Sequence, residues 1–506
     1  MNNPQVLETE AKPNMVRCSS CSFCSSRPAD SGSVGTSDAR GSELRHHCGV
    51  IGLYGVSNAA RKAHAGLHAL QHRGQESAGI VASDGRQIQS AKGLGLLTEA
   101  IGHKDLQNLP GHIAVGHTRY STTGAKRVQN IQPLVIEYSQ GIVAVAHNGN
   151  LANARSLREL YESRGSIFQT STDSEIIVHL LADPEHIGVA DPLGESLHHV
   201  RGAYSLAMMT SSRLMAARDP QGFRPLSLAK LGSGYVVASE TCAFDLLGAE
   251  YIRDIEPGEI VCIDDDGLRS WQFVASPPEN QARCIFEHIY FARPDSRVFG
   301  RTVHNVRLRL GEKLAETHPV EADLVMSIPH SGDSSALGYS RRSGIPLDFG
   351  FISNRYIGRT FIIPPEENRS DHVEIKLNVV KDVVKGKRLV VVDDSIVRGT
   401  TSRGRLSMLR EMGARELHMR ISAPPIRHPC YYGIDFPDTE QLIAARRSVS
   451  EIADFLSVDS LGYQTVEGLL GAAQAERSEY CLACFTGNYP VSVDNDMRRE
   501  ALERKT

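Results

Sequence analysis

The first half of the chain carries short runs of apolar residues, separated by turn residues. The runs at 203–209, 235–239 and 259–263 are each long enough for one short strand. Helical spacing of apolar residues appears at 61–70 and again at 175–182. This part of the chain is therefore predicted to form layers of short strands with a few helices.

The second half follows another pattern, in which an apolar strand is followed by a turn and then by a helix. Residues 322–328 have the composition of a buried strand, and a turn and the helical stretch 336–344 come after it. The unit repeats at 388–402, and 416–422 is predicted to be a further strand. Strands that alternate with helices indicate a doubly wound parallel sheet, which binds ligands at the carboxyl ends of its strands.

Two stretches of polar composition divide the chain. Residues 1 to about 45 are rich in Ser and Gly and poor in apolar residues, so they are predicted to be disordered. The sequence ASPPENQ at 275–281 has the composition of a linker. We expect a presequence that is removed, a first domain, a second domain and a C-terminal segment, at residues 1–47, 48–280, 281–470 and 471–506.

Composition sets limits on the function. The chain has 506 residues, which is enough for two or three domains. Its net charge of −4 gives no electrostatic footprint for nucleic acid or for an anionic membrane. No apolar run is long enough to span a bilayer, and the polar N-terminus lacks the apolar segment of a secretory signal. The default expectation is a soluble cytoplasmic protein.

The stretch from Val390 to Ser402, VVVDDSIVRGTTS, carries the clearest candidate chemistry. Its β-branched run ends in Asp393 and Asp394, whose carboxylates can hold ribose hydroxyls or a magnesium shell. The Gly/Thr-rich turn that follows can cradle a phosphate at a helix N-terminus. A bare pair of acids could equally be the exit turn of an ordinary strand. The whole string, however, resembles the phosphoribosyl-pyrophosphate (PRPP) loop of type I phosphoribosyltransferases.

Cys48 is a second candidate, because it stands at the start of the first strand-like run of the chain. A cut before Cys48 would free its α-amino group, which titrates close to the thiol and can act as its base. No histidine or aspartate partner is then required. Taken alone, a buried structural cysteine is the simpler interpretation.

Four ordered motifs after Cys48 reverse that judgement. They are QHRGQESAG, GHTRYSTTG, VAVAHNGNL and TSTDSE, at 71–79, 116–124, 143–151 and 170–175. Taken singly, Asn148-Gly149 could be a hairpin turn and Asp173 a helix cap. Together, they resemble the class II glutamine amidotransferase domain, an N-terminal-nucleophile hydrolase with an αββα sandwich, over roughly residues 48–280.

This resemblance implies roles for the residues of the motifs. Cys48 would attack the side-chain amide of glutamine and pass through a glutamyl thioester. The Asn148 side chain and the Gly149 N–H would form the oxyanion hole. A bidentate guanidinium would bind the α-carboxylate of glutamine, and a carboxylate would bind its α-ammonium group. The residues implied in glutamine binding are Arg119, Thr122 and Asp173.

With both halves considered, residues 48 to about 490 resemble the glutamine PRPP amidotransferases, which open de novo purine synthesis. The resemblance implies that ammonia from glutamine crosses a dry path and attacks magnesium-bound PRPP. The products would be 5-phosphoribosylamine, glutamate and pyrophosphate. The magnesium ion would be held at Ser331, Asp393 and Asp394. The 5′-phosphate would be bound by Val397, Arg398, Gly399, Thr400, Thr401 and Ser402.

The long segment 354–378 between the two repeated units is rich in Arg, Lys and Pro. It could be a solvated surface loop, or a lid that closes over an anionic substrate. Arg359 and Lys376 are its candidates for contact with pyrophosphate. One departure from the family is His330, which stands where the pyrophosphate loop usually carries an acid.

Four cysteines match the positions that ligate a [4Fe–4S] cluster in one branch of this family. Four thiolates suit such a cluster, but they also suit structural zinc, and spacing alone does not choose between them. The resemblance favours iron–sulfur. It also implies feedback inhibition by purine nucleotides and a homo-oligomer. The four cysteines are Cys284, Cys430, Cys481 and Cys484.

Two rival functions explain less of the sequence. An amidotransferase of the glucosamine-6-phosphate synthase type would share the first half, but its sugar-isomerase half lacks a loop like DDSIVRGTTS. A PRPP- or nucleotide-sensing regulator with an inactive glutaminase would be expected to have lost at least one glutaminase residue. None of these is missing from the chain: Cys48, Arg119, Asn148 and Asp173.

Overall fold

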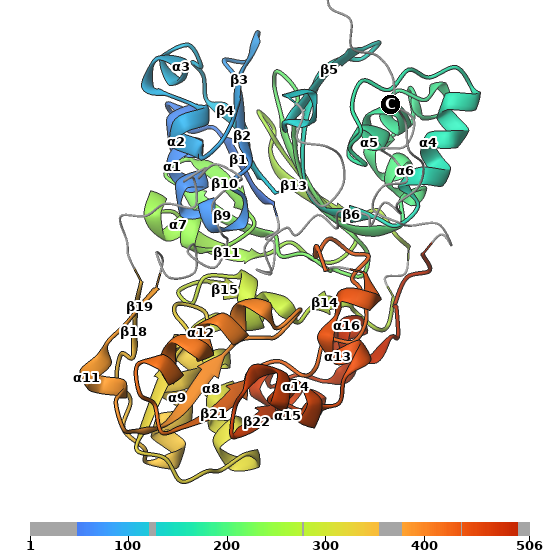
Figure 1. Cartoon of the computed structure of the whole chain (residues 1–506). Coiled ribbons are helices and arrows are strands. Elements are labelled where there is room, and N and C mark those ends of the chain that lie inside the picture. The colour runs from blue at the N-terminus through green and yellow to red at the C-terminus, as the bar shows by residue number, and fades with distance from the viewer. Residues whose placement is uncertain (1–47, 121–127, 276–277, 354–376, 437, 494–506) are drawn as a thin grey trace, which may run out of the picture. The chain divides into compact units, whose positions relative to one another are not determined.

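The computed structural model describes residues 48–120, 128–275, 278–353, 377–436 and 438–493 (Figure 1). All of them belong to one compact unit, Ser42–Thr506. Within the described ranges, no helix is both long and apolar enough to cross a membrane.

The first half contains two antiparallel sheets. The seven strands of the first sheet are, in spatial order, β11 (Glu250–Asp254), β9 (Ser227–Leu231), β10 (Gly234–Ala238), β1 (Gly49–Tyr54), β4 (Ile113–Arg119), β2 (Ser77–Ser83) and β3 (Ile88–Leu94). The six strands of the second sheet are β13 (Gly267–Gln272), β12 (Glu259–Asp264), β8 (Leu214–Arg218), β7 (Gly202–Met209), β6 (Gly141–Leu151) and β5 (Leu134–Tyr138).

These two sheets pack face to face, with helices on both outer faces. Alternation along a strand explains the layers, because Val50 of β1 points into the core between the sheets and Ile51 points to the helix side. Helices α1 (Ala59–Ala69) and α7 (Cys242–Leu247) cover the first sheet. Helices α5 (Glu175–Leu181) and α6 (Pro192–His198) cover the second. The predicted αββα sandwich is confirmed.

The second half is built on a parallel sheet of four strands with helices on both faces. Its strands are, in spatial order, β17 (Leu324–Ser327), β20 (Arg388–Asp393), β21 (Glu416–Ile421) and β22 (Ser460–Tyr463). Val390 of β20 packs with α8 (Val303–Thr317) and α9 (Asp333–Ser343). Val391 faces the opposite core, with α12 (Thr400–Glu411) and α14 (Val449–Leu456). The predicted doubly wound parallel sheet is confirmed.

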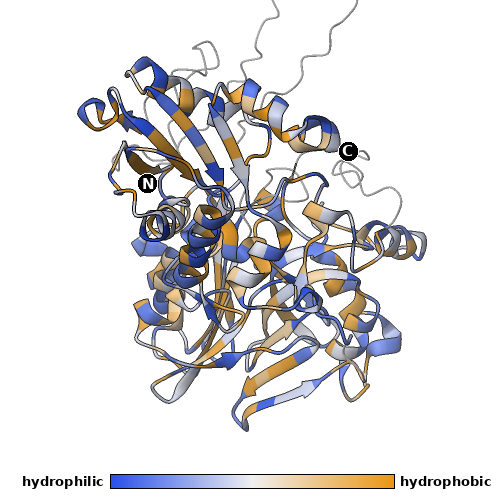
Figure 2. Cartoon of the chain, turned by 90° about the horizontal axis from the view of Figure 1, so that it is seen from below, coloured by the Kyte–Doolittle hydropathy of each residue, from blue (hydrophilic) through white to orange (hydrophobic). Residues whose placement is uncertain are grey.

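Hydrophobic residues concentrate on the strands, while several helices carry hydrophilic faces (Figure 2).

Short elements complete the described chain. The larger of the short elements are α2 (Leu97–Ala100), α3 (His103–Gln107), α4 (Ala154–Ser163), α11 (Lys381–Val384), α13 (Ile443–Arg446), α15 (Val466–Ala473) and α16 (Ala483–Thr486). The paired short strands are β14 (Arg283–Cys284) with β23 (Tyr480–Cys481), β15 (Arg297–Val298) with β16 (Arg301–Thr302), and β18 (Phe351–Ser353) with β19 (Leu377–Val379). The helical turns are η1 (Gln71–Arg73), η2 (Val128–Asn130), η3 (Pro184–His186), η4 (Glu287–Phe291, a π-helical segment), η5 (Thr439–Gln441) and η6 (Arg477–Glu479).

Candidate active sites

Cys48 immediately precedes β1 and is buried, with 8% of its surface exposed. Its Sγ lies 3.5 Å from the carbonyl oxygen of Tyr120, the residue that follows β4. Burial raises the pKa of the Cys48 thiol to about 11, against a smaller opposing effect of the Arg119 charge. The thiol therefore keeps its proton near neutral pH, and any attack by Cys48 requires a base.

Asn148 and Gly149 lie within β6 and not in a turn, so the hairpin interpretation of this pair is wrong. The Asn148 side chain is fully buried, and neither its nitrogen nor its oxygen has a hydrogen-bond partner among the described residues. Buried amides are almost always paired, so an unpaired one indicates a ligand position. At Gly149, a Cβ atom would lie 1.9 Å from the carbonyl oxygen of Ala203, so only glycine fits.

Asp173 is held beside these residues by hydrogen bonds. Its Oδ2 accepts from the backbone N–H of Leu151 at 2.9 Å, in β6, and its Oδ1 accepts from Ser174 Oγ at 3.3 Å. Asp173 also lies close enough to Cys48 for its charge to raise the pKa of the thiol. Its carboxylate thus connects to the strand of Asn148 instead of capping α5 with a side-chain hydrogen bond.

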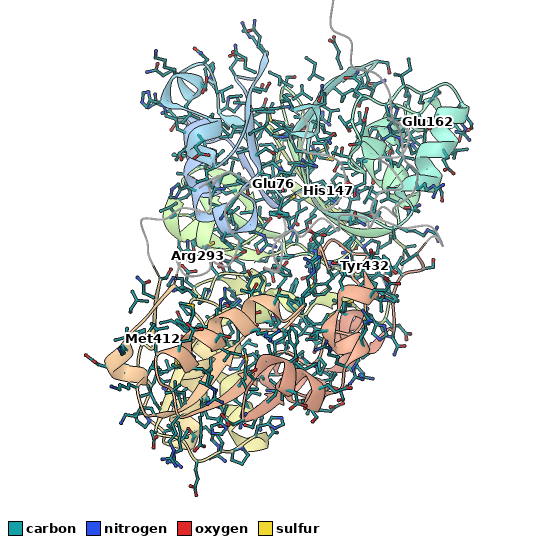
Figure 3. All side chains as sticks on the ribbon, viewed as in Figure 1. Glu76, His147, Glu162, Arg293, Met412 and Tyr432 are labelled. Carbon is teal, nitrogen blue, oxygen red and sulfur yellow. The ribbon has the colours of Figure 1, made fainter. Side chains whose placement is uncertain are left out.

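Two histidines that the sequence analysis did not single out connect the two sheets of the first half. His117 Nε2, in β4, lies 3.1 Å from the carbonyl oxygen of His147, in β6 (Figure 3). His147 Nδ1 lies 2.9 Å from Ser174 Oγ. Burial lowers the pKa of His117 to about 3, so this side chain is neutral. Both histidines belong to the predicted motifs, GHTRYSTTG and VAVAHNGNL.

The second candidate site lies where β17 and β20 end. Asp393 is the last residue of β20, and the next residue, Asp394, accepts a hydrogen bond from Ser331 Oγ at 2.5 Å. A Cβ on Gly332 would lie 2.5 Å from the carbonyl oxygen of Val392, which shows how closely the loop after β17 approaches β20. The structure therefore brings Ser331, Asp393 and Asp394 together.

The two carboxylates are buried, at 4% and 7% exposed. Burial raises the pKa of Asp393, and the neighbouring charge of Asp394 raises it further. Burial also raises the pKa of Asp394, while the Ser331 and Ser395 hydroxyls act in the opposite direction. A divalent cation favours the ionised form of a carboxyl group, which burial disfavours, and oxygen ligands of this kind suit Mg²⁺. The residues present therefore fit a magnesium site that substrate oxygens would complete.

A glycine fixes the start of α12 beside these acids. Gly399 has a φ of 80°, and a Cβ there would lie 3.0 Å from Ile443 Cδ1. The helix then begins at Thr400, so its free N–H groups lie directly after the acidic strand end. Such a helix terminus suits a phosphate. The predicted phosphate segment at 397–402 is thus a loop and the first turn of α12.

Three of the predicted residues lie outside the described ranges. Thr122 falls within 121–127, and Arg359 and Lys376 fall within 354–376. Their predicted roles stay predictions.

Four cysteines from distant parts of the chain line one internal cavity of about 20 Å³. Cys284 in β14 stands opposite Cys481 in β23, and Cys484 follows in α16. Cys430 belongs to the loop after β21, and all four are free thiols. The other cysteines raise the pKa of Cys484 in addition to the larger effect of burial.

This donor set fits a cofactor that binds four thiolates. The cavity wall is almost wholly apolar apart from the sulfurs, Arg224 and the tyrosines. As the described residues are placed, no group of three or more His, Cys, Asp or Glu could hold a metal ion. Cys242 and Cys262, in contrast, lie elsewhere in the first half and are buried as small apolar side chains.

Sequence comparisons give three similarities. A family model described as a glutamine amidotransferase domain matches residues 117–245. The amidophosphoribosyltransferase of Bacillus subtilis is 48% identical over 458 residues, which cover 90% of this chain and 96% of that protein. The amidophosphoribosyltransferase of Methanocaldococcus jannaschii is 47% identical over 465 residues, which cover 88% of this chain and 98% of that protein.

Solved structures give the same relationship. A structure described as glutamine PRPP amidotransferase from B. subtilis, complexed with ADP and GMP, matches with a TM-score of 0.84. It is 48% identical in sequence, and the match covers 89% of this chain and 98% of that chain. The similarity therefore extends over both halves of the fold.

Proposed function

The chain belongs to the amidophosphoribosyltransferase family, and we propose that its activity is divided between the site around Cys48 and the site around Asp393 and Asp394. Members of this family catalyse the first step of purine synthesis. The buried Asn148 amide, which has no hydrogen-bond partner among the described residues, is the observation that carries the glutaminase assignment. The test is an assay for 5-phosphoribosylamine with glutamine and then with ammonium as the nitrogen donor.

At the first site, Cys48 attacks the side-chain carbonyl carbon of glutamine. Burial keeps the thiol protonated near neutral pH, so a base is needed, and the free α-amino group of the same residue accepts the proton. The Asn148 side chain and the Gly149 N–H donate to the oxyanion, an interaction worth several kcal/mol when preorganised. Arg119 binds the α-carboxylate of glutamine and Asp173 binds its α-ammonium group. Thr122 helps to line the pocket.

Collapse of the tetrahedral intermediate breaks the C–N bond and leaves a glutamyl thioester on Cys48. Ammonia departs with the proton that the α-amino group returns, and water then hydrolyses the thioester to glutamate. The path to the second site must be dry, because ammonium, the main form of free ammonia near neutral pH, has no lone pair for attack.

At the second site, ammonia attacks C1 of PRPP, the C–N bond forms and pyrophosphate leaves. Ser331, Asp393 and Asp394 would hold Mg²⁺, which supplies charge neutralisation for the departing pyrophosphate. The first turn of α12 would bind the 5′-phosphate through the segment 397–402. Arg359 and Lys376 would contact the pyrophosphate.

Maturation of the chain provides a separate test. The α-amino base exists only if the bond between His47 and Cys48 is cut, so residues 1–47 are expected to be absent from the active protein. Intact-mass spectrometry of the purified enzyme should give the mass of a chain that begins at Cys48. A fully active chain that still carries residues 1–47 would contradict the proposed base.

We further propose that Cys284, Cys430, Cys481 and Cys484 hold a [4Fe–4S] cluster. The cavity that they line and their free thiols support this proposal. None of the four belongs to the proposed nucleophile or PRPP segments, so the role of the cluster would be structural and not catalytic. It would join β14 to the C-terminal segment and so close a long loop of chain.

Cys481→Ser is expected to lower the yield of folded protein and its tolerance of air, because one of four cluster ligands is lost. Iron and sulfide analysis of anaerobically purified wild-type protein should give about four of each per chain. Cys262→Ser is the matched control, because Cys262 is a buried free thiol that lies outside the cavity. One zinc and no iron per wild-type chain would replace the iron–sulfur assignment with a structural zinc.

Regulation and assembly are proposed from the relatives. The B. subtilis structure described as a complex with ADP and GMP supports feedback inhibition by purine nucleotides. We propose a homo-oligomeric enzyme of the cytoplasm that acts on glutamine and PRPP and binds neither nucleic acid nor membrane.

A further inference from the structure

Four fully buried charged side chains form a continuous series of ion pairs next to Cys48. Its members, each at most 1% exposed, are Arg73, Arg224, Glu240 and Glu287. Arg73 donates to the two Glu287 oxygens at 2.8 and 3.0 Å, and it also pairs with Glu240. Arg224 Nη1 lies 3.5 Å from Glu287 Oε1. Positive and negative charges therefore alternate along the series.

Near one end of the series, Arg73 holds the backbone of the proposed nucleophile. Arg73 Nε donates to the carbonyl oxygen of Cys48 at 3.2 Å. Glu240 lies shortly after β10. This strand pairs with β1, which Cys48 immediately precedes. Because one guanidinium binds the carbonyl and both carboxylates, the position of Cys48 depends on where these carboxylates lie.

The other end of the series lies in the wall of the cysteine cavity. Arg224 lines the cavity together with the four cysteines, and its Nη2 donates to the carbonyl oxygen of Tyr432 at 2.6 Å (Figure 3). Its Nε has no hydrogen-bond partner among the described residues. An unpaired N–H on a fully buried cation, in a wall that also carries four thiols, suits a cavity in which the sulfurs are negatively charged.

Glu287 connects the two ends. It begins η4, shortly after Cys284, whereas Arg73 and Arg224 both come from the first half. Burying each charge costs several kcal/mol, and removing one partner leaves another charge buried without compensation. A series of this kind therefore constrains the positions of its side chains strongly, because displacement of one member disturbs the ion pair that the next member makes.

We propose that Arg224, Glu287 and Arg73 form a positioning relay, which fixes the Cys48 carbonyl relative to the wall of the cysteine cavity. The relay rests on the proposed role of Cys48 as nucleophile. Its contact with Cys48 is to the backbone carbonyl oxygen and not to the sulfur, so its members act through the position of Cys48. A change in the cavity wall then alters the rate of the glutaminase reaction, while the PRPP site continues to use free ammonium.

The test replaces Glu287 by glutamine, which keeps the shape of the side chain and removes the charge that both arginines share. Cys48 is probed with a chloroketone analogue of glutamine: the sulfur displaces chloride, a C–S bond forms, and chloride and a proton are released. The alkylation rate and glutamine-dependent synthesis are expected to fall about tenfold or more, because small displacements of a nucleophile are costly. Ammonium-dependent synthesis is expected to stay within about twofold of wild type.

Two further variants and one control complete the design. Glu287→Asp restores the carboxylate and is expected to recover part of the alkylation rate. Arg224→Met is expected to slow alkylation and to speed the loss of iron from the protein in air. Glu259→Gln is the matched control, because it neutralises a buried carboxylate paired with Arg253 in the same half. Its alkylation rate is expected to equal that of wild type.

Equal alkylation rates in Glu287→Gln and wild type would overturn the relay. Parallel loss of glutamine- and ammonium-dependent synthesis in both Glu287 variants would also overturn it, since that is the pattern of a purely structural pair. If Glu287→Gln does not fold, Arg224→Met tests the relay in its place. The relay then requires that the alkylation rate of Arg224→Met fall while iron is still bound. Wild-type protein that is not alkylated at Cys48 would instead contradict the proposed nucleophile.

Discussion

Cys48→Ala is expected to abolish synthesis of 5-phosphoribosylamine from glutamine and to leave synthesis from ammonium near the wild-type rate. In the proposed mechanism only the nitrogen source depends on the thiol, and the proposed PRPP site is built from other residues. The measurement is the rate of product formation with each donor, using equal amounts of folded protein.

Cys262→Ala serves as the control for this result. Cys262 is buried in the same half of the chain, in β12, and its thiol contacts Asp264, which belongs neither to the site nor to the ion-pair series. Both donors should then support normal synthesis. Loss of both activities in well-folded Cys48→Ala protein would contradict the division into two sites.

The double replacement Asp393→Asn and Asp394→Asn is expected to stop synthesis from both donors, while slow hydrolysis of glutamine continues. The amides keep the shape of the site but remove the charges that would hold Mg²⁺ and ribose. A loss of several kcal/mol of transition-state stabilisation corresponds to a fall of about a hundredfold or more in rate. The measurements are product formation with glutamine and with ammonium, and glutamate release.

Stability should not account for this loss. Burial raises the pKa of both carboxyls, so their ionised forms oppose folding, and the amides remove that cost. The unfolding temperature of the double variant is therefore expected not to fall. Asp382→Asn, at an exposed position in α11, is the control. Near-normal synthesis with ammonium in the double variant would refute the assignment of the two acids.

Much of the fold could be predicted from the sequence because its signals are local. The strand that ends in Asp393, the turn at Gly399 and the helix from Thr400 lie within one short stretch. The helical stretch predicted at 336–344 is observed as α9, at Asp333–Ser343. The expected boundary at 470 falls within the residues of α15, and the division into domains stays a prediction.

The buried ion pairs could not be predicted from the sequence. Arg73 lies in the motif QHRGQESAG, but its partners Glu240 and Glu287 are 167 and 214 residues away. A charged residue that is buried by pairing has the same local sequence as one on the surface. The unpaired Asn148 amide was equally hidden, because only packing shows that no side chain in the described chain completes it.

The pairing of β14 with β23 has a consequence for the order in which the protein is made. Cys284 stands opposite Cys481, near the two ends of the second half. A ribosome delivers the N-terminal part of a chain first, and domains fold as their residues emerge. The sandwich and most of the parallel sheet can form while the last residues are still being synthesised. The cysteine cavity cannot close until Cys484 has emerged, so its closure belongs to the end of synthesis.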